Sequence, residues 1–166
     1  MPRLKAPESL INHLTEFNLM TALAFGILLM AVAGIGSAIG MSKAANAALG
    51  VKAEKGKECP NLAIYVLMPF SQTLYGLVLL AMAVFLFSDK FPTDPVGITI
   101  TMISAVFAGA CIGTSALTQG AVGARACDAI GKTGHGKGEA IMFMGTIETV
   151  ALFMMVMFIV GMFILL

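Results

Sequence analysis

Charged residues are scarce in this chain of 166 residues. Only 11% of the residues are Asp, Glu, Lys or Arg, whereas 58% are hydrophobic and the mean hydropathy is +0.94. Soluble domains carry roughly 25% charged residues, so the composition excludes an ordinary soluble domain and indicates a membrane protein. The formal net charge of +1 also argues against a nucleic-acid partner, because such binding depends on many Lys and Arg residues that neutralise phosphates.

Cysteine and histidine are also rare. Cys59, Cys111 and Cys127 are odd in number and fit neither a disulfide framework nor metal-ligand spacing, so we interpret them as small packing residues. His13 and His135 lie in separate polar segments, and no metal site is expected from them. No Ser–His–Asp or Cys–His arrangement is apparent, so the chain is predicted to be non-catalytic by itself.

Long apolar runs take the place of the missing charges. Four stretches exceed the roughly 20 residues that a membrane-spanning helix needs, and they cover residues 17–49, 62–88, 96–130 and 140–166. The first run is too long and lies too far from the start for a signal peptide. We therefore predict an all-α membrane protein with four transmembrane helices. Its segments are a polar N-terminal extension (1–16), a first transmembrane hairpin (17–88), an outward-facing loop (89–95) and a second transmembrane hairpin (96–166).

The extension over residues 1–16 has two interpretations. Pro7 followed by Glu8 and Ser9 is typical of a helix start, and a short helix lying in the membrane interface would follow. A disordered tail fits the polar composition equally well. The sequence leaves both open.

Positive charges gather at one end of the predicted helices. Near the two predicted hairpin loops lie Lys43, Lys52, Lys55, Lys57, Arg125, Lys132 and Lys137. Only Arg3, Lys5 and Lys90 lie toward the other end. By the positive-inside rule, we expect a multi-pass protein of the cell membrane with cytoplasmic hairpin loops, and with both termini and the loop 89–95 on the opposite side.

The two predicted hairpins look like an internal duplication. Residues 36–39 (Gly-Ser-Ala-Ile) are similar to residues 114–117 (Thr-Ser-Ala-Leu), 78 positions later. Gln72 corresponds to Glu148, 76 positions later. The first hairpin thus has an amide where the second has an acid. Repeated hairpins are a common design of membrane transporters.

Small residues recur every four positions on the first and third predicted helices. They are Gly36, Gly40 and Ala44 on the first, and on the third two runs, Ala105, Gly109 and Gly113, then Gly120 and Ala124. Such patterns let helix backbones approach closely in lipid. We expect these two helices to form the inner wall of a ring, although packing within a single bundle explains the same pattern.

Glu148 is the most informative residue, because it lies in the run 140–166, which carries no other charge. A carboxylate at the centre of a membrane helix costs roughly 2.5–3.5 kcal/mol and usually marks an ion or proton pathway. Counting about 1.5 Å per residue from the cytoplasmic ends places Glu148, Gln119 and Gln72 at one level. We therefore expect these three side chains to meet.

Further oxygen atoms are expected at the same level. Ser71 is adjacent to Gln72, and Tyr75 lies three positions on, on the same helix face. Pro69 lets the backbone near Met68 bend, so that a carbonyl there can face the site. Hard cations prefer oxygen ligands, and one negative charge among neutral oxygens suits a monovalent ion. A proton would need few of these groups, so the pattern favours Na⁺ over H⁺.

Three ordered motifs carry a resemblance to a known family. They are residues 68–76 (Met-Pro-Phe-Ser-Gln-Thr-Leu-Tyr-Gly), residues 119–120 (Gln-Gly) and residues 147–149 (Ile-Glu-Thr). Together with the glycine-patterned helices, they resemble the proteolipid ring component (the K or c subunit) of V-type rotary ATPases, in particular the sodium-translocating bacterial form. The resemblance covers residues 17–166. Ser71 stands where a threonine is usual, and the N-terminal extension is longer than expected.

The resemblance implies roles for individual residues. Glu148 would bind the transported ion, with further ligands from Gln119, Gln72, Ser71 and the backbone oxygen of Met68. Tyr75 would lock Glu148. The protein would assemble into an oligomeric rotor ring of four-helix copies, and each copy would carry one ion because Gln72 replaces the acid of the first hairpin.

The expected function is that of a rotor-ring subunit of a V-type ATPase or ATP synthase, which translocates Na⁺ as the ring turns. Its expected partners are other copies of the chain, a stator subunit with a membrane arginine, soluble central-stalk subunits at the cytoplasmic loops, and the lipid bilayer. Alternatives are the same rotor carrying H⁺ and, more distantly, a small four-helix multidrug exporter. The number of copies in the ring, the direction of the ATP reaction and the role of residues 1–16 stay open.

Overall fold

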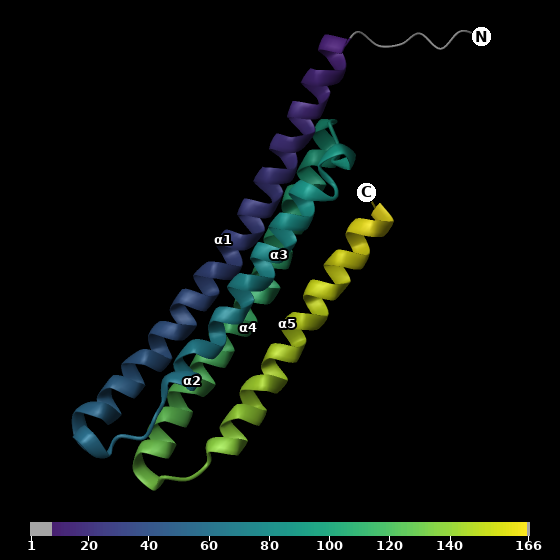
Figure 1. Ribbon diagram of the computed structural model, residues 1–166. Coiled ribbons are helices and arrows are strands. Elements are labelled where there is room, and N and C mark those ends of the chain that lie inside the picture. Colours follow the sequence, from purple (N-terminus) through teal and green to yellow (C-terminus); the bar gives the residue numbers. More distant parts are fainter. Residues whose placement is uncertain (1–7, 166) are drawn as a thin grey trace.

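The computed structural model describes residues 8–165, and helices joined by short connections make up this range, with no strand among the described residues. Figure 1 shows long helices lying side by side. The elements are α1 (Glu8–Lys55), a 3₁₀ turn (Gly56–Glu58), α2 (Ala63–Leu67), a 3₁₀ turn (Met68–Phe70), α3 (Ser71–Phe85), a 3₁₀ turn (Ser88–Lys90), α4 (Pro95–Thr133) and α5 (Lys137–Leu165).

Four helical segments are long and apolar enough to cross a membrane, which confirms the predicted fold class. They cover Asn12–Glu58, Ala63–Phe85, Pro95–Thr133 and Lys137–Ile164. The second segment joins α2 and α3 into one span. The protein is therefore a multi-pass membrane protein of four spanning segments within the described range.

The spanning helices form two hairpins that lie against each other. α1 packs along α4, α3 packs on α1, and α5 packs on α4. Figure 1 shows the two hairpin loops, after α1 and after α4, at one end of the molecule. The beginning of α1, the end of α5 and the connection from α3 to α4 lie at the other end.

Glycines let α1 and α4 approach until their backbones touch. A Cβ atom added at Gly36 would collide with the backbone of Gly113, and one added at Gly40 would collide with the carbonyl of Ala116. A Cβ atom at Gly120 would strike the backbone of Gly40. The expected close approach of the first and third spanning helices is therefore confirmed.

The second span is interrupted at Pro69, as the sequence predicted. α2 ends at Leu67, a 3₁₀ turn covers Met68–Phe70, and α3 begins at Ser71. Pro69 has no N–H to offer to the carbonyl of Tyr65. That carbonyl lies against α4, where a Cβ atom at Gly123 would be 2.5 Å from it. The missing side chain of Gly123 thus makes room for the released carbonyl.

The predicted boundary at residues 16 and 17 does not coincide with a helix end. α1 begins at Glu8 and continues without a break into the first span, since no Gly or Pro interrupts residues 8–25. Figure 1 shows this first part of α1 extending beyond the other helices. Residues 1–7 of the predicted extension lie outside the described part of the chain. The first and third spanning helices also run past their predicted ends at 49 and 130, to Lys55 and Thr133.

Capping residues fix the ends of α4. The side chain of Asp94 accepts a hydrogen bond from the backbone N–H of Gly97 (3.0 Å), and Pro95 occupies the first helical position. At the other end Gly134 adopts a left-handed conformation (φ 73°) and donates to the carbonyl of Ile130 (2.8 Å). These caps turn the chain sharply and return α5 alongside α4.

Candidate ion-binding site

Glu148 lies half-buried in the middle of α5 and faces α3 and α4. The hydroxyl of Tyr75 on α3 donates a hydrogen bond to Oε1 of Glu148 at 2.7 Å. Nε2 of Gln119 on α4 donates to Oε2 of the same carboxylate at 3.4 Å. Both hydrogen-bond partners of the carboxylate are thus neutral donors from neighbouring helices, and one bond is short, as expected for a charge-assisted hydrogen bond.

Two fully buried amides form the centre of the site. Gln72 and Gln119 are each 0% exposed, and Nε2 of Gln72 donates to Oε1 of Gln119 at 3.1 Å. Nε2 of Gln119 also donates to the backbone carbonyl of Met144 on α5 at 3.0 Å. Buried amides cost free energy unless they are hydrogen-bonded, and here each amide has partners on other helices. The pair therefore ties α3, α4 and α5 together at the level of Glu148.

Three oxygen atoms gather at the bend of the second span. The hydroxyl of Ser71 donates to the carbonyl oxygen of Met68 at 2.9 Å, and it lies 3.1 Å from Oε1 of Gln72. The 3₁₀ turn around Pro69 brings the Met68 carbonyl and the Ser71 side chain together. Carbonyl, hydroxyl and amide oxygens of this kind are ligands of hard cations.

All six residues predicted for the site belong to one continuous network. It leads from Met68 through Ser71, Gln72 and Gln119 to Glu148, and ends at Tyr75. The expected meeting of Glu148, Gln119 and Gln72 is therefore found in the structure. Their role in binding an ion stays a prediction.

The amide of Gln119 is oriented differently from what a ligand role requires. Its nitrogen faces Glu148 and the Met144 carbonyl, whereas its oxygen accepts the hydrogen bond from Gln72. In this arrangement Gln119 orients the carboxylate as a donor. To offer its oxygen to a cation beside Glu148, the amide would have to turn.

Sequence reasoning missed one side chain and two carbonyl groups. The hydroxyl of Ser115 on α4 donates to the carbonyl of Ile147 (2.9 Å) and accepts a hydrogen bond from Nε2 of Gln72 (3.4 Å). The Met144 carbonyl is the second acceptor on α5. Ser115 was detectable, because it precedes Gln119 by one helical turn on the same face. The carbonyl groups carry no signal in the sequence.

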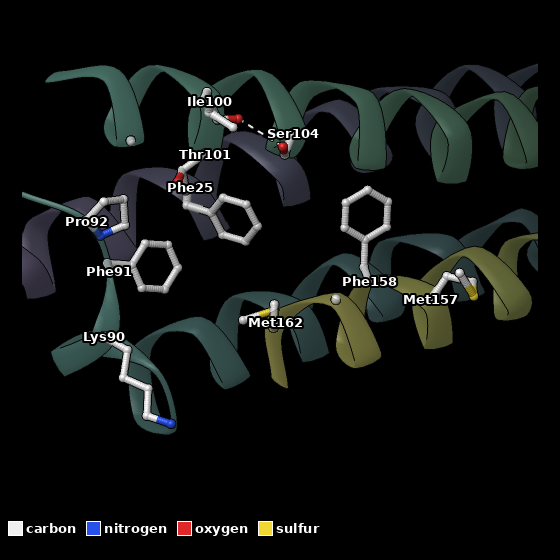
Figure 2. A pocket seen from close by; sticks show the side chains of 12 residues that line it. Phe25, Lys90, Phe91, Pro92, Ile100, Thr101, Ser104, Met157, Phe158 and Met162 are labelled. Atoms are coloured by element: carbon white, nitrogen blue, oxygen red, sulfur yellow. Dashed lines mark hydrogen bonds between the residues drawn. The ribbon is translucent and has the colours of Figure 1, made fainter. Parts of the chain in front are cut away.

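A cavity at the end of the molecule opposite the hairpin loops is a different kind of site. Its volume is about 520 Å³, and it lies between α4, α5 and the connection after α3. Figure 2 shows Phe25, Phe91, Phe158 and Met162 around it, with the amino group of Lys90 pointing away. The hydroxyl of Ser104 is already bonded to the carbonyl of Ile100 at 2.9 Å. The cavity contains no carboxylate among its lining residues, so the Glu148 network is the stronger candidate for binding a cation.

The fold and the site together define a class: a multi-pass membrane protein of duplicated helical hairpins with one half-buried carboxylate among neutral polar groups. Residues 24–83 match the model of the family of the C subunit of ATP synthase. These residues cover the first hairpin, so Glu148 lies outside this match.

A curated relative agrees with the family model. Over 117 residues the chain is 30% identical to the A-type ATP synthase subunit K of Methanocaldococcus jannaschii, and the alignment covers 70% of this chain and 52% of the relative. The chain thus spans about half the length of the relative it matches. Both comparisons thus show a similarity to the proteolipid (c or K) subunits of rotary ATPases.

Proposed function

We propose that the chain is a rotor-ring subunit of an ion-transporting rotary ATPase or ATP synthase, and that each copy carries one Na⁺ on Glu148. One observation carries this proposal: a single carboxylate in mid-membrane is joined to neutral oxygen-bearing groups from α3 and α4 in one hydrogen-bond network. The chain supplies the moving ion site and is non-catalytic by itself.

The proposed ring consists of copies standing side by side, with α1 and α4 on the inner side and α3 and α5 on the outer side. The close contact of α1 and α4 through Gly36, Gly40 and Gly120 supports a narrow inner wall. On the outer side Glu148 would meet a stator subunit that carries a membrane arginine. Soluble central-stalk subunits would dock on the basic hairpin loops, which we place on the cytoplasmic side. Whether the complex is of the A-type or the V-type follows from these partners.

The coupling of ion transport to rotation follows from the free energy of a charge in lipid. An ionised Glu148 facing lipid costs several kcal/mol unless a cation or a proton neutralises it. An unoccupied carboxylate would therefore stay at the stator arginine, and an occupied one would enter the lipid as the ring turns. Each elementary charge that crosses the membrane exchanges about 2.3 kcal/mol per 100 mV with the membrane potential.

Na⁺ is favoured over H⁺ because of the oxygen atoms beside the carboxylate. Met68, Ser71 and Gln72 offer a carbonyl, a hydroxyl and an amide oxygen within one turn of the bend. A transported proton would need only Glu148 and one partner. The alternative of H⁺ transport draws on a different observation, since Tyr75 and Gln119 both approach Glu148 as donors rather than as oxygen ligands. The similarity to c and K subunits favours either rotor over a small multidrug exporter.

Carbodiimide labelling of Glu148 in the detergent-purified oligomer tests the proposal. The reagent reacts with protonated carboxyl groups, so a bound Na⁺ slows the reaction. We expect Na⁺ to protect Glu148 at neutral and alkaline pH while equal concentrations of K⁺ do not. Less protection is expected at lower pH, because H⁺ competes with Na⁺ for the same carboxylate.

Two variants control the labelling. Glu148→Gln removes the reactive group, whereas Glu139→Gln changes an exposed acid at the start of the same helix and leaves the reaction as it is. Labelling that is indifferent to Na⁺ at every pH would overturn the sodium proposal in favour of H⁺. A purified protein that forms only dimers would overturn the ring.

A further inference from the structure

Ser115 links the three helices of the site through one hydroxyl group. It lies on α4 and is 7% exposed. Its Oγ donates a hydrogen bond to the carbonyl of Ile147 on α5 (2.9 Å) and lies 3.4 Å from Nε2 of Gln72 on α3. A serine hydroxyl has one proton and two lone pairs. Since the proton is used on Ile147, a lone pair is left to accept the proton of Gln72.

This hydrogen bond determines which end of the Gln72 amide faces the bend. Nε2 of Gln72 has two N–H groups, which point to Oγ of Ser115 and to Oε1 of Gln119. With both donors directed toward α4, Oε1 of Gln72 is directed toward Ser71, 3.1 Å away. If the amide turned, its oxygen would face the oxygen of Gln119. The pair of acceptors on α4 therefore keeps the Gln72 oxygen beside the Ser71 hydroxyl.

The same hydroxyl also holds the backbone of α5 next to Glu148. Ile147 directly precedes Glu148, and its carbonyl is the acceptor for Ser115. One turn earlier, the carbonyl of Met144 accepts the hydrogen bond from Gln119. Two side chains of α4, one turn apart, thus fix the position of α5 at the level of the carboxylate.

The first hairpin contains the corresponding serine without these contacts. Ser37 matches Ser115 in the repeat, 78 positions earlier. It is 0% exposed, but its hydroxyl donates to the carbonyl of Ala33 in its own helix at 3.4 Å. The same residue type in the same place of the repeat therefore has a local partner in one hairpin and two interhelical partners in the other.

We infer that Ser115 is a positioning residue for the transported cation. It keeps the oxygen of Gln72 turned toward the cation, and it holds α5 where Glu148 can reach that oxygen. This inference rests on the proposed sodium function. The hydroxyl does not itself bind the cation, because its proton is directed to Ile147 and its acceptor side to Gln72.

The test measures the Na⁺ concentration that halves the rate of carbodiimide labelling of Glu148 in the purified oligomer. Ser115→Ala removes two hydrogen bonds, and we expect the half-protecting concentration to rise roughly 5- to 30-fold. Ser37→Ala removes an equally buried hydroxyl with only a local partner, and we expect less than a two-fold change. The labelling rate without Na⁺ is measured for each variant, and protection by Na⁺ is expressed relative to that rate.

A second pair of variants isolates the hydroxyl if Ser115→Ala does not assemble. Ser115→Thr keeps the hydroxyl. Ser115→Val introduces a side chain with the shape of threonine but without the hydroxyl. The additional methyl group has space, since Ser115 and Ile147 also line a surface cavity of about 630 Å³ between α4 and α5. We expect the threonine variant to stay within three-fold of the unmodified protein and the valine variant to lose affinity as alanine does.

The outcomes separate this inference from the proposed function. If Na⁺ protects the unmodified protein but Ser115→Ala and Ser115→Val are protected equally well, the role of Ser115 is refuted and the sodium site stands. An equal loss in Ser37→Ala and Ser115→Ala also refutes it, because the effect is then general to buried serines. If Na⁺ does not protect the unmodified protein, the sodium function fails and the positioning role fails with it.

Discussion

The two hairpins share a plan but differ at the residues of the proposed ion site. Gln72 in the first hairpin corresponds to Glu148 in the second, and Pro69 corresponds to Gly145 when the same offset of 76 is applied. The second span is interrupted by a 3₁₀ turn at Met68–Phe70, whereas α5 is continuous from Lys137 to Leu165. One hairpin thus contributes a bend with oxygen atoms, and the other contributes a straight helix with the carboxylate.

This difference explains how a duplicated chain forms a single site. A second carboxylate at position 72 would lie buried beside Gln119 and would add a second negative charge next to Glu148. The amide instead provides both an oxygen for the bend and two N–H groups for α4. The second hairpin has also gained interhelical contacts that the first lacks, as Ser115 and Ser37 illustrate. The two halves therefore form one asymmetric network between them.

The largest effect is expected from making the two hairpins alike. Glu148→Gln gives the second hairpin the amide of the first, and we expect complete loss of Na⁺ binding and of ion transport by the assembled complex. The helical fold should be retained, since a neutral amide removes the cost of a charge in the membrane. Uptake of ²²Na⁺ into vesicles containing the whole complex measures the effect. Residual uptake above the background of protein-free vesicles would contradict it.

A large effect on the stability of the oligomer is expected where α1 and α4 touch. Gly120→Ala places a Cβ atom against the backbone of Gly40, and such overpacking costs about 3 kcal/mol at a contact that cannot relax. Gly145→Ala is the matched control, because its Cβ atom meets nothing within 4 Å. The dissociation temperature of the detergent-solubilised oligomer should fall for the first variant and stay unchanged or rise for the second. Equal temperatures for both would contradict the close approach of α1 and α4.

An intermediate effect on Na⁺ affinity is expected when the buried amide of Gln119 on α4 is removed. Gln119→Leu removes its hydrogen bonds to Gln72, Met144 and Glu148, and the half-protecting Na⁺ concentration should rise about 100-fold. Met41 occupies the corresponding position of the first hairpin, 78 residues earlier. Met41→Leu should change the concentration by less than two-fold. Similar values for both leucine variants would show that the amide network does not serve the ion.

The smallest effect, on the rate of Na⁺ release, is expected when the hydroxyl group of Tyr75 is removed. Tyr75→Phe removes the 2.7 Å hydrogen bond to Glu148. The rate of Na⁺ release should increase about 10-fold, because the free energy of one hydrogen bond to a charged group corresponds to about this factor. Tyr65→Phe is the control, because the Tyr65 hydroxyl donates to the carbonyl of Lys137 far from the site (3.3 Å). Release can be followed as the recovery of carbodiimide labelling after dilution into Na⁺-free buffer. Unchanged release in Tyr75→Phe would exclude a locking role.

The sequence predicted the helices and the depth of the site because both depend on local patterns. Apolar runs define the spans, and counting residues along them placed Glu148, Gln119 and Gln72 at one level. The bend at Pro69 also follows from the chemistry of one residue. A helix start at Glu8 was one of two alternatives, but the unbroken continuation of that helix into the first span was not predicted, since polar residues continue a helix as readily as they form a tail.

The orientation of the amides was beyond the reach of sequence patterns. Whether Gln119 offers its oxygen or its nitrogen to Glu148 depends on the partners Gln72 and Met144, which come from two other helices. The partnership of Ser115 with Ile147 depends in the same way on how closely α4 and α5 approach. The backbone carbonyls of Met144 and Ile147 take part in the site without any residue type that marks them.

The number of Na⁺ ions bound per chain tests the central claim most directly. Equilibrium binding of ²²Na⁺ to the purified oligomer, combined with quantitative amino-acid analysis, gives this ratio. The account predicts one Na⁺ per chain in the unmodified protein and none in Glu148→Gln. A ratio of two, or Na⁺ binding that persists without the Glu148 carboxylate, would contradict a single asymmetric site, and a ratio of zero in the unmodified protein would contradict Na⁺ as the transported ion.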